Sequence, residues 1–331
     1  MNLKNPLLKI ENLKMHINTY EGKIKAVDGV DLELFAGEII GIVGESGSGK
    51  SMTSRTILKL LPEGGEVISG KITFKGRDIL QSSEEEIRKI RGSKISFIFQ
   101  NPATFLNPVL KIGDQIIENI ILHQKIKKKN ANESAIRLLT DVGLRNVDKI
   151  IDCYPHQLSG GMQQRAMIAM AISCNPDLII ADECTTALDV TTQLQILDLL
   201  KDISKKLNTS IIIITHNLAV VAYLCTRTYV MHEGKTIEDA KTSDLFFDPK
   251  HDYTKKLLKS SRIIDEEKFY STEGESEILK VDRIKKIFRL PGTKYPLNAV
   301  DDVSFKLKEG EIFGIAGESG SGKTTIANLL M

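Results

Sequence analysis

The stretch Gly44-Glu45-Ser46-Gly47-Ser48-Gly49-Lys50-Ser51 follows the apolar run Ile39-Ile40-Gly41-Ile42-Val43 and precedes a sequence that favours a helix. It fits the pattern G-x-x-x-x-G-K-[ST], in which glycines let the backbone curl so that successive N–H groups face a phosphate. The N-terminus of the following helix favours negative charge at the same point. We therefore expect these eight residues to bind a phosphate group, with Lys50 reaching the β- and γ-phosphates and the Ser51 hydroxyl binding Mg²⁺. The alternative is a glycine-rich turn that only starts a helix.

The same pattern occurs a second time, as Gly317-Glu318-Ser319-Gly320-Ser321-Gly322-Lys323-Thr324. The offset between the copies is constant, because Lys323 stands as far beyond Lys50 as Ala299 stands beyond Ala26. A repeat of this length is too long for a solenoid and indicates two copies of a whole domain. We expect a complete domain over residues 1–262, a polar linker over 263–276 and an incomplete second domain over 277–331. The candidate phosphate-binding residues of the second copy are Gly317, Gly322, Lys323 and Thr324.

Short apolar runs alternate with stretches of helical composition along the first copy. The runs Leu178–Ala181 and Ile211–Ile214 are continuous, which is typical of strands buried on both faces. Between and after them, Gln163–Ile172 and Thr191–Leu200 are predicted to be helices. This alternation predicts an α/β domain with a largely parallel central sheet.

The second copy contains only the start of this alternation. We expect strands around Leu279–Val281 and at Ile312–Ile315, followed by the loop and the first turns of a helix. About 55 residues form a marginal core even in complete small domains. We therefore expect residues 277–331 not to form a working nucleotide site. Apolar side chains that we expect to be left partly uncovered are Val303, Phe305, Leu307, Ile312, Phe313 and Leu330.

Acidic and polar residues follow three of the apolar runs of the first copy. Asp182 and Glu183 come directly after Leu178–Ala181. Because Mg²⁺ prefers oxygen ligands and keeps several waters, Asp182 beside the phosphate loop can hold it, and Glu183 can orient the attacking water. Gln100 is expected near the metal and the water, and His216 is expected to donate to the γ-phosphate. The alternatives are a loop start for the acidic pair and structural roles for Gln100 and His216.

The string Leu158-Ser159-Gly160-Gly161-Met162-Gln163-Gln164-Arg165 combines a serine N-cap, two glycines and a helix. These features make a second anion-binding helix N-terminus, which has no lysine of its own. Phosphate-loop enzymes in general do not need a second element of this kind. The alternative is an ordinary capped helix.

The composition limits the possible partners. A formal net charge of +2 is too small to argue for nucleic acid or an anionic membrane surface. The basic run Lys125–Lys129 is interpreted as a solvated helix end, with a phosphate or lipid contact as the alternative. The four cysteines show no paired metal-ligand spacing and suit a reduced cytosolic compartment. We find neither the apolar core of a signal peptide nor a run of the ~20 apolar residues that span a bilayer, so any membrane-spanning part would belong to another chain.

At these residues the chain resembles the ATP-binding-cassette superfamily, over residues 7–260. Six motifs occur in the family's order. They are the Walker A loop (Gly44–Ser51), the Q-loop (Gln100), the signature (Leu158–Gln163), Walker B (Leu178–Glu183), the D-loop (Ala187–Asp189) and the switch histidine (His216). The resemblance implies a P-loop NTPase cassette of the α/β class, with an antiparallel β subdomain and a helical signature subdomain.

The resemblance also implies ATP and Mg²⁺ as cofactors, and two cassettes that sandwich two ATP molecules head to tail. Mg²⁺ would be held by Ser51, Gln100 and Asp182, and the catalytic residues would be Glu183, His216 and Gln100. A further set would contact nucleotide at the interface with the partner cassette: Ser159, Gly160, Gly161, Gln163 and Asp189.

Four other segments resemble the dipeptide, oligopeptide and nickel importer subfamily: Phe99–Pro108, Tyr154–Ser159, Thr185–Val190 and Pro249–Thr254. This implies an ATPase subunit at the cytoplasmic face of the membrane that drives the import of di- or oligopeptides. Its partners would be integral-membrane permease subunits, a second cassette and, indirectly, an extracytoplasmic solute-binding protein, with no nucleic acid. The alternatives are nickel or glutathione-like cargo, or a soluble tandem-cassette ATPase that acts on ribosomes or DNA.

The chain departs from the family pattern at several positions. Ile17 stands where the family usually has an aromatic residue that stacks on adenine, and Tyr20 is a candidate substitute. Cys184 replaces the usual proline after the Walker B glutamate, and Asn217 replaces the usual aspartate after the switch histidine. The last two departures leave the phosphate chemistry unchanged.

Overall fold

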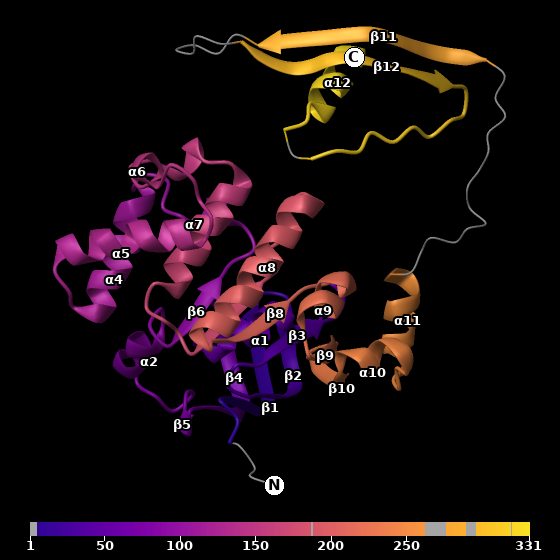
Figure 1. Ribbon diagram of the computed structural model, residues 1–331. Coiled ribbons are helices and arrows are strands. Elements are labelled where there is room, and N and C mark those ends of the chain that lie inside the picture. Colours follow the sequence, from indigo (N-terminus) through magenta and orange to yellow (C-terminus); the bar gives the residue numbers. More distant parts are fainter. Residues whose placement is uncertain (1–4, 187, 262–275, 289–295, 319) are drawn as a thin grey trace. The chain divides into compact units, whose positions relative to one another are not determined.

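The computed structural model describes residues 5–186, 188–261, 276–288, 296–318 and 320–331. Its contacts divide the chain into two compact units, which are described separately here (Figure 1). The first comprises Met1–Ala187 and Thr192–Arg262, and the second comprises Leu188–Thr191 and Ile263–Met331. Apart from its last residue, the linker expected over 263–276 lies outside the described residues, as do Ala187 and Ser319.

Six of the described strands form the central sheet of the first unit. Their order across the sheet is β10 (Lys235–Lys241), β9 (Arg227–His232), β3 (Ile39–Val43), β8 (Ser210–Ile214), β7 (Leu178–Asp182) and β6 (Ile95–Ile98). All neighbours are parallel except β10, which runs antiparallel to β9. Every residue of β3, β7 and β8 is buried, which explains their uninterrupted apolar sequences. The predicted parallel α/β fold is confirmed.

Four further strands form an antiparallel sheet in the first unit. Their order is β2 (Gly22–Leu34), β1 (Leu8–Thr19), β4 (Gly65–Phe74) and β5 (Arg77–Asp78). Apolar residues of β1, including Leu8, Ile10 and Met15, share one buried cluster with Ile40 and Ile42 of β3. This common core fixes the antiparallel sheet against the strand that carries the first phosphate loop.

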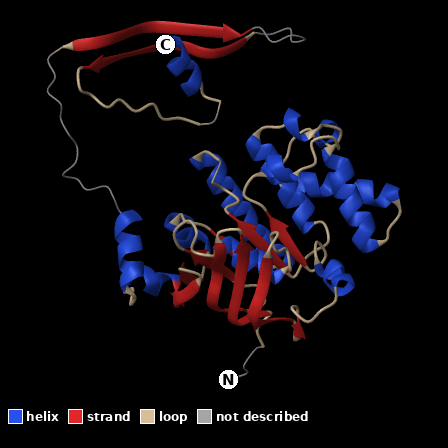
Figure 2. Cartoon of the chain, turned by 180° about the vertical axis from the view of Figure 1, so that it is seen from behind, coloured by secondary structure: helices blue, strands red, loops and turns tan. Residues whose placement is uncertain are grey.

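The helices of the first unit fall into two groups (Figures 1 and 2). Near the sheets lie α1 (Lys50–Ile57), α2 (Glu84–Ile90), α8 (Val190–Leu207), α9 (Leu218–Leu224), α10 (Thr242–Phe247) and α11 (Asp252–Ser261). The others are the short α3 (Pro102–Phe105), then α4 (Ile112–Gln124), α5 (Lys128–Asp141), α6 (Val147–Ile150), the 3₁₀ turn Pro155–Gln157 and α7 (Gly160–Ile172). Helices α4, α5 and α7 pack on one another and form the expected helical subdomain.

The basic run is a solvated connection between two helices, as predicted. Lys125 ends α4 in a left-handed conformation, and α5 begins at Lys128. All four lysines of the run are exposed.

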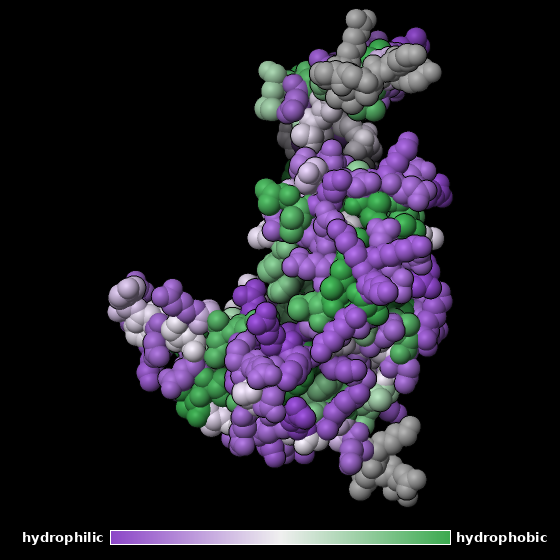
Figure 3. Space-filling model, turned by 90° about the vertical axis from the view of Figure 1, so that its left-hand side faces the viewer, coloured by the Kyte–Doolittle hydropathy of each residue, from purple (hydrophilic) through white to green (hydrophobic). Residues whose placement is uncertain are grey.

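Figure 3, viewed from the side on which α4 and α5 lie in Figure 1, shows mostly hydrophilic residues with apolar ones interspersed. No helix in the described parts of the chain is both long and apolar enough to cross a membrane.

The second unit contains a two-stranded antiparallel sheet of β11 (Glu277–Phe288) and β12 (Leu297–Lys308), and the helix α12 (Lys323–Leu330). The strand predicted around Leu279–Val281 is confirmed as part of β11. Val303, Phe305 and Leu307 are only half-buried, and Phe313 and Leu330 are exposed. The expected incomplete burial of these apolar side chains is therefore observed.

The strand predicted at Ile312–Ile315 is wrong. These residues form no strand, and Ile312 is 98% exposed. In the first unit the corresponding β3 is hydrogen-bonded on one side to β8 and on the other to β9. The described residues of the second unit offer no such neighbours, and an extended segment without them has nowhere to place its backbone hydrogen bonds except water.

Candidate functional site

The first phosphate loop connects the end of β3 to the start of α1. Gly44, Gly47 and Gly49 have φ of 154°, 81° and 97°, conformations that side chains rarely adopt. A Cβ on Gly44 would lie 2.2 Å from the carbonyl oxygen of Met231, and one on Gly49 would lie 2.4 Å from that of Ala26. The loop is therefore held by close backbone packing that only glycine permits.

Lys50 begins α1 and points back across the loop. It is 5% exposed, and its Nζ donates to the carbonyl oxygens of Gly44 (2.9 Å) and Glu45 (2.6 Å) and to the Ser48 hydroxyl (3.2 Å). Burial lowers the pKa of Lys50, while the nearby carboxylates of Glu183, Asp182 and Glu45 act in the opposite direction. The result is a buried cation enclosed by a curled backbone, which is what a polyphosphate anion requires.

A cavity of about 400 Å³ opens above the loop. The residues that line it come from four separate parts of the chain: Ile24, Lys25 and Ala26 of β2, then Ser46, Gly47, Gly49, Lys50, Ser51 and Met52, then Gln100, and Glu183. Sequence reasoning predicted the loop, Gln100 and Glu183 but missed the β2 residues. The predicted substitute Tyr20 is fully exposed and is not among the lining residues. Ile24 does line the cavity. It is the cross-strand partner of Ile17, a pairing that depends on the register between β1 and β2.

Two of the three ligands predicted for Mg²⁺, Ser51 and Asp182, are hydrogen-bonded to each other. The amide nitrogen of the third, Gln100, bonds to Glu183 instead. Asp182 ends β7, is 5% exposed, and accepts a hydrogen bond of 2.9 Å from the Ser51 hydroxyl at the start of α1. Burial raises the pKa of Asp182, and the hydrogen bond from Ser51 opposes that shift. No cluster of three or more His, Cys, Asp or Glu side chains suited to a metal occurs among the described residues. A hydroxyl and a carboxylate beside a phosphate loop fit Mg²⁺, which commonly takes one or two protein ligands and completes its shell with phosphate and water.

Glu183 is held between the other two predicted catalytic residues. Its Oε2 accepts from the Gln100 amide (2.5 Å), and its Oε1 lies 2.9 Å from Nδ1 of His216. The backbone of Glu183 is left-handed, with φ of 46°, and its N–H donates to the carbonyl of Ile214 on the neighbouring β8 (2.8 Å). A strained conformation at the end of a strand aims a half-buried carboxylate into the cavity.

The predicted signature residues lie elsewhere in the first unit. Ser159 caps α7 by accepting from the N–H of Met162 (3.4 Å), and the Gln163 amide donates to the carbonyls of Pro155 (2.8 Å) and Leu158 (3.2 Å). None of these residues lines the cavity above the phosphate loop. Gly160 is exposed, and a Cβ there would meet no atom within 4 Å. Gly161 is half-buried. Asp189, which the contacts assign to the second unit, is also half-buried and immediately precedes α8. The signature thus has an open helix N-terminus that takes no part in the cavity above the phosphate loop.

The second phosphate loop repeats part of the local geometry of the first, at its last two glycines and its lysine. Gly320 and Gly322 have φ of 81° and 94°, and Lys323 Nζ donates to the carbonyls of Gly317 (2.8 Å) and Glu318 (2.6 Å). Thr324, which corresponds to Ser51, is exposed. Gly317, unlike its counterpart Gly44, is not among the glycines with positive φ, and the described residues of the second unit supply no acid corresponding to Asp182 or Glu183.

Comparisons with known proteins point to one family. A family model described as "ABC transporter" matches residues 27–186 and 300–331. The oligopeptide transport ATP-binding protein AppD of Bacillus subtilis is 50% identical over 262 residues, which are 79% of this chain and 80% of that protein. The peptidoglycan transport ATP-binding protein YejF of Agrobacterium fabrum is 42% identical over 327 residues, 97% of this chain and 60% of that protein. A solved dimeric ATP-binding cassette in a post-hydrolysis state, bound to ADP and Pi, matches with a TM-score of 0.64 at 29% identity, covering 71% of this chain and 98% of that chain.

Proposed function

Because the chain belongs to the ABC transporter family, we propose that it is the ATP-binding and ATP-hydrolysing subunit of an importer that carries di- or oligopeptides. The observation that carries the proposal is one cavity lined by Lys50, Ser51, Gln100 and Glu183, with Asp182 bonded to Ser51. The peptide cargo is supported by the names of relatives such as AppD. Within this proposal residues 1–262 form the first cassette, and 277–331 belong to a second.

The residues around the cavity account for the conversion of ATP and water to ADP and phosphate. The N–H groups of the loop and the Lys50 ammonium bind the phosphates, and the Glu183 carboxylate orients the attacking water. Gln100 holds one oxygen of that carboxylate, and His216 the other. When bound, Mg²⁺ neutralises charge on the phosphate oxygens, and Ser51, Asp182 and Gln100 are the residues that would hold it.

The position of the signature supports a partner cassette. Ser159, Gly160 and Gly161 stand apart from the cavity that holds Lys50, so in this proposal they complete the site of another cassette, together with Gln163 and Asp189. The partners are that second cassette, the permease subunits at whose cytoplasmic face the chain works, and indirectly a solute-binding protein. A nucleotide that binds the closed pair more tightly than the open pair shifts the permease between its two states.

The partner requirement predicts that ATP turnover per molecule rises with protein concentration, or when the partner cassette is added.

A sharper test of the same requirement mixes two single variants of this chain, Lys50→Ala and Gly161→Asp. Each is expected to be inactive alone, but a head-to-tail pair of the two contains one intact phosphate loop facing one intact signature. Steady-state phosphate release should therefore recover partly on mixing. Full, concentration-independent turnover by a strict monomer would contradict the proposal.

The part of the cavity lined by β2 leads to a further prediction, about where the adenine base binds. Ile24 is 54% exposed beside the phosphate loop, and no aromatic residue is among those that line the cavity. Ile24→Tyr should stack on adenine and lower the Kd for ATP by about two- to tenfold. The matched control is Ile68→Tyr, at a half-exposed isoleucine on β4 of the same sheet that does not line the cavity. Equal gains by both variants in equilibrium binding, or none by Ile24→Tyr, would refute this placement of the base.

A further inference from the structure

A tyrosine far along the chain contacts the first phosphate loop. The N–H of Glu45, the second residue of the loop, donates to the hydroxyl of Tyr253 in the first turn of α11, at 3.1 Å across 208 positions of sequence. Tyr253 belongs to the segment Pro249–Thr254, one of those that resemble the peptide and nickel importer subfamily. The ATP chemistry described above assigns this segment no role. The contact joins this segment directly to the site.

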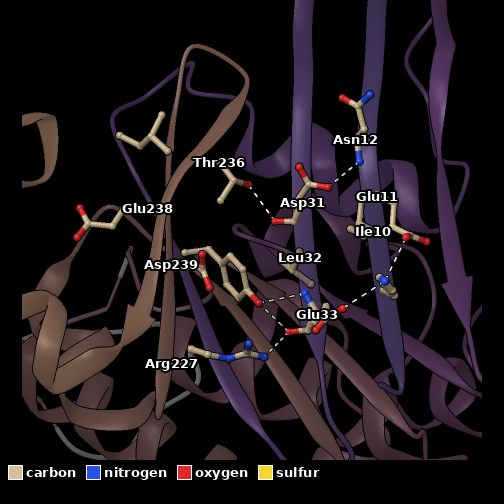
Figure 4. A pocket seen from close by; sticks show the side chains of 13 residues that line it. Ile10, Glu11, Asn12, Asp31, Leu32, Glu33, Arg227, Thr236, Glu238 and Asp239 are labelled. Carbon is tan, nitrogen blue, oxygen red and sulfur yellow. Dashed lines mark hydrogen bonds and ion pairs between the residues drawn. The ribbon is translucent and has the colours of Figure 1, made fainter. Parts of the chain in front are cut away.

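Tyr253 is itself held on several sides. Its ring stacks on that of His232 at the end of β9, with centroids 4.0 Å apart. Its own N–H donates to Nδ1 of His251 (3.1 Å). The N–H groups of Lys250 and His251 donate to the two carboxylate oxygens of Glu238 on β10 (2.7 and 3.0 Å). The side chain of Glu238 is turned away from Asp31 and Glu33 in Figure 4, which leaves its carboxylate free to receive these bonds.

The hairpin that holds Tyr253 also touches the loop. The carbonyl of Met231 on β9 packs against Gly44, and the N–H of Gly234, between β9 and β10, donates to the carbonyl of Ser48 (3.1 Å). Burial raises the pKa of the Tyr253 hydroxyl, while the hydrogen bond from the N–H of Glu45 acts in the opposite direction. The hairpin and the start of α11 thus support the outer side of the loop.

The peptide groups on both sides of Glu45 are fixed by hydrogen bonds. The carbonyl oxygen of Glu45 accepts from Lys50 Nζ, and its N–H donates to Tyr253. When a polyphosphate occupies the cavity, the Lys50 ammonium must serve the phosphate oxygens, which weakens its hold on the loop. The bond to Tyr253 does not compete with phosphate in this way. We infer that Tyr253 is a positioning residue that keeps the phosphate loop in its binding conformation, an inference that rests on the proposed function.

The test is Tyr253→Phe, which keeps the ring stacked on His232 and removes only the hydroxyl. A lost hydrogen bond of ordinary strength predicts a roughly two- to tenfold rise in the Kd and KM for ATP. The kcat at saturating ATP should stay close to that of the wild type, because the loop is restored once nucleotide is bound. The measurements are equilibrium ATP binding, steady-state phosphate release and thermal unfolding without nucleotide.

The matched control is Tyr229→Phe. Tyr229 also accepts from a backbone N–H, that of Glu33 at 3.0 Å. It is among the residues that line the pocket drawn in Figure 4, and no residue of the phosphate loop lines that pocket. The variant Tyr229→Phe should change the Tm of the protein but not its affinity for ATP. If Tyr253→Phe lowers the Tm while the ATP affinity stays at the wild-type value, its role is structural only and the inference is wrong.

A second variant covers the case in which Tyr253→Phe does not fold. Glu238→Gln weakens the hold on the N–H groups of Lys250 and His251 and should raise the Kd for ATP in the same direction. An unchanged Kd there overturns the inference. If the wild-type chain does not bind ATP at all, both the proposed function and this inference are refuted. If Lys50→Ala loses ATP binding but neither Tyr253→Phe nor Glu238→Gln changes the Kd, only this inference is refuted.

Discussion

Glu183→Gln is expected to leave ATP binding intact and to reduce turnover by roughly 10²- to 10⁴-fold, the range expected on loss of a general base. The amide has the same shape as the carboxylate but neither its charge nor its basicity. In the structure both oxygens of Glu183 are engaged, one by the Gln100 amide and one by the His216 ring. The substitution therefore removes the partner that orients the water while the phosphate loop is left unchanged.

The measurements for Glu183→Gln are equilibrium ATP binding and steady-state phosphate release. Both are made with the partner cassette present, or at a protein concentration high enough for two cassettes to pair. Glu118→Gln is the matched control, because Glu118 is an exposed glutamate on α4. It should behave as the wild type in both assays. Near-normal turnover by Glu183→Gln under these conditions would show that another group positions the water.

Lys50→Ala is expected to weaken ATP binding itself, by about 10- to 100-fold. Hydrogen bonds from a charged donor are stronger than neutral ones, and the Lys50 ammonium is buried, where its interaction with phosphate is poorly screened. The loss should appear in the Kd for ATP, in contrast to Glu183→Gln, in which binding is retained. The two variants together separate the binding of ATP from its hydrolysis.

The matched control for Lys50→Ala is Lys323→Ala, at the same position of the second loop. Lys323 makes the same two backbone bonds, to Gly317 and Glu318, but among the described residues of the second unit no acid corresponds to Asp182 or Glu183. It should leave ATP binding unchanged. Micromolar binding that survives Lys50→Ala and disappears on adding Lys323→Ala would show that the second loop binds nucleotide, against our expectation.

Several features of the fold and the site could be predicted because local sequence determines them. Continuous apolar runs identified β3, β7 and β8, since a strand buried on both faces must be apolar throughout. The glycine pattern of the phosphate loop specifies its backbone: Gly47 and Gly49 have φ of 81° and 97°, and their counterparts Gly320 and Gly322 have 81° and 94°. These two positions agree although their surroundings differ, because glycine adopts positive φ without steric cost. The first glycine does not follow: Gly44 has φ of 154°, packed against Met231, whereas Gly317 is not among the glycines with positive φ.

Contacts between distant segments could not be predicted in this way. Ile24 of β2 lines the cavity together with the phosphate loop, Gln100 and Glu183, and Tyr253 reaches Glu45 from the start of α11, which is held on the β9–β10 hairpin. No spacing rule links residues that lie so far apart along the chain.

The two copies of the phosphate-loop segment separate local from tertiary control. Ile39–Val43 and Ile312–Ile315 are similar apolar runs before the same loop, but only the first is a strand. The sequence by itself determined the loop, its lysine and the identity of the acidic residues, because these depend on backbone conformations and chemistry encoded within a few residues. Tertiary structure decided whether the preceding run became a strand and which side chains enclosed the cavity. The physical reason is that a strand obtains its hydrogen bonds from neighbouring strands, which β8 and β9 supply to β3 and which the described second unit does not supply.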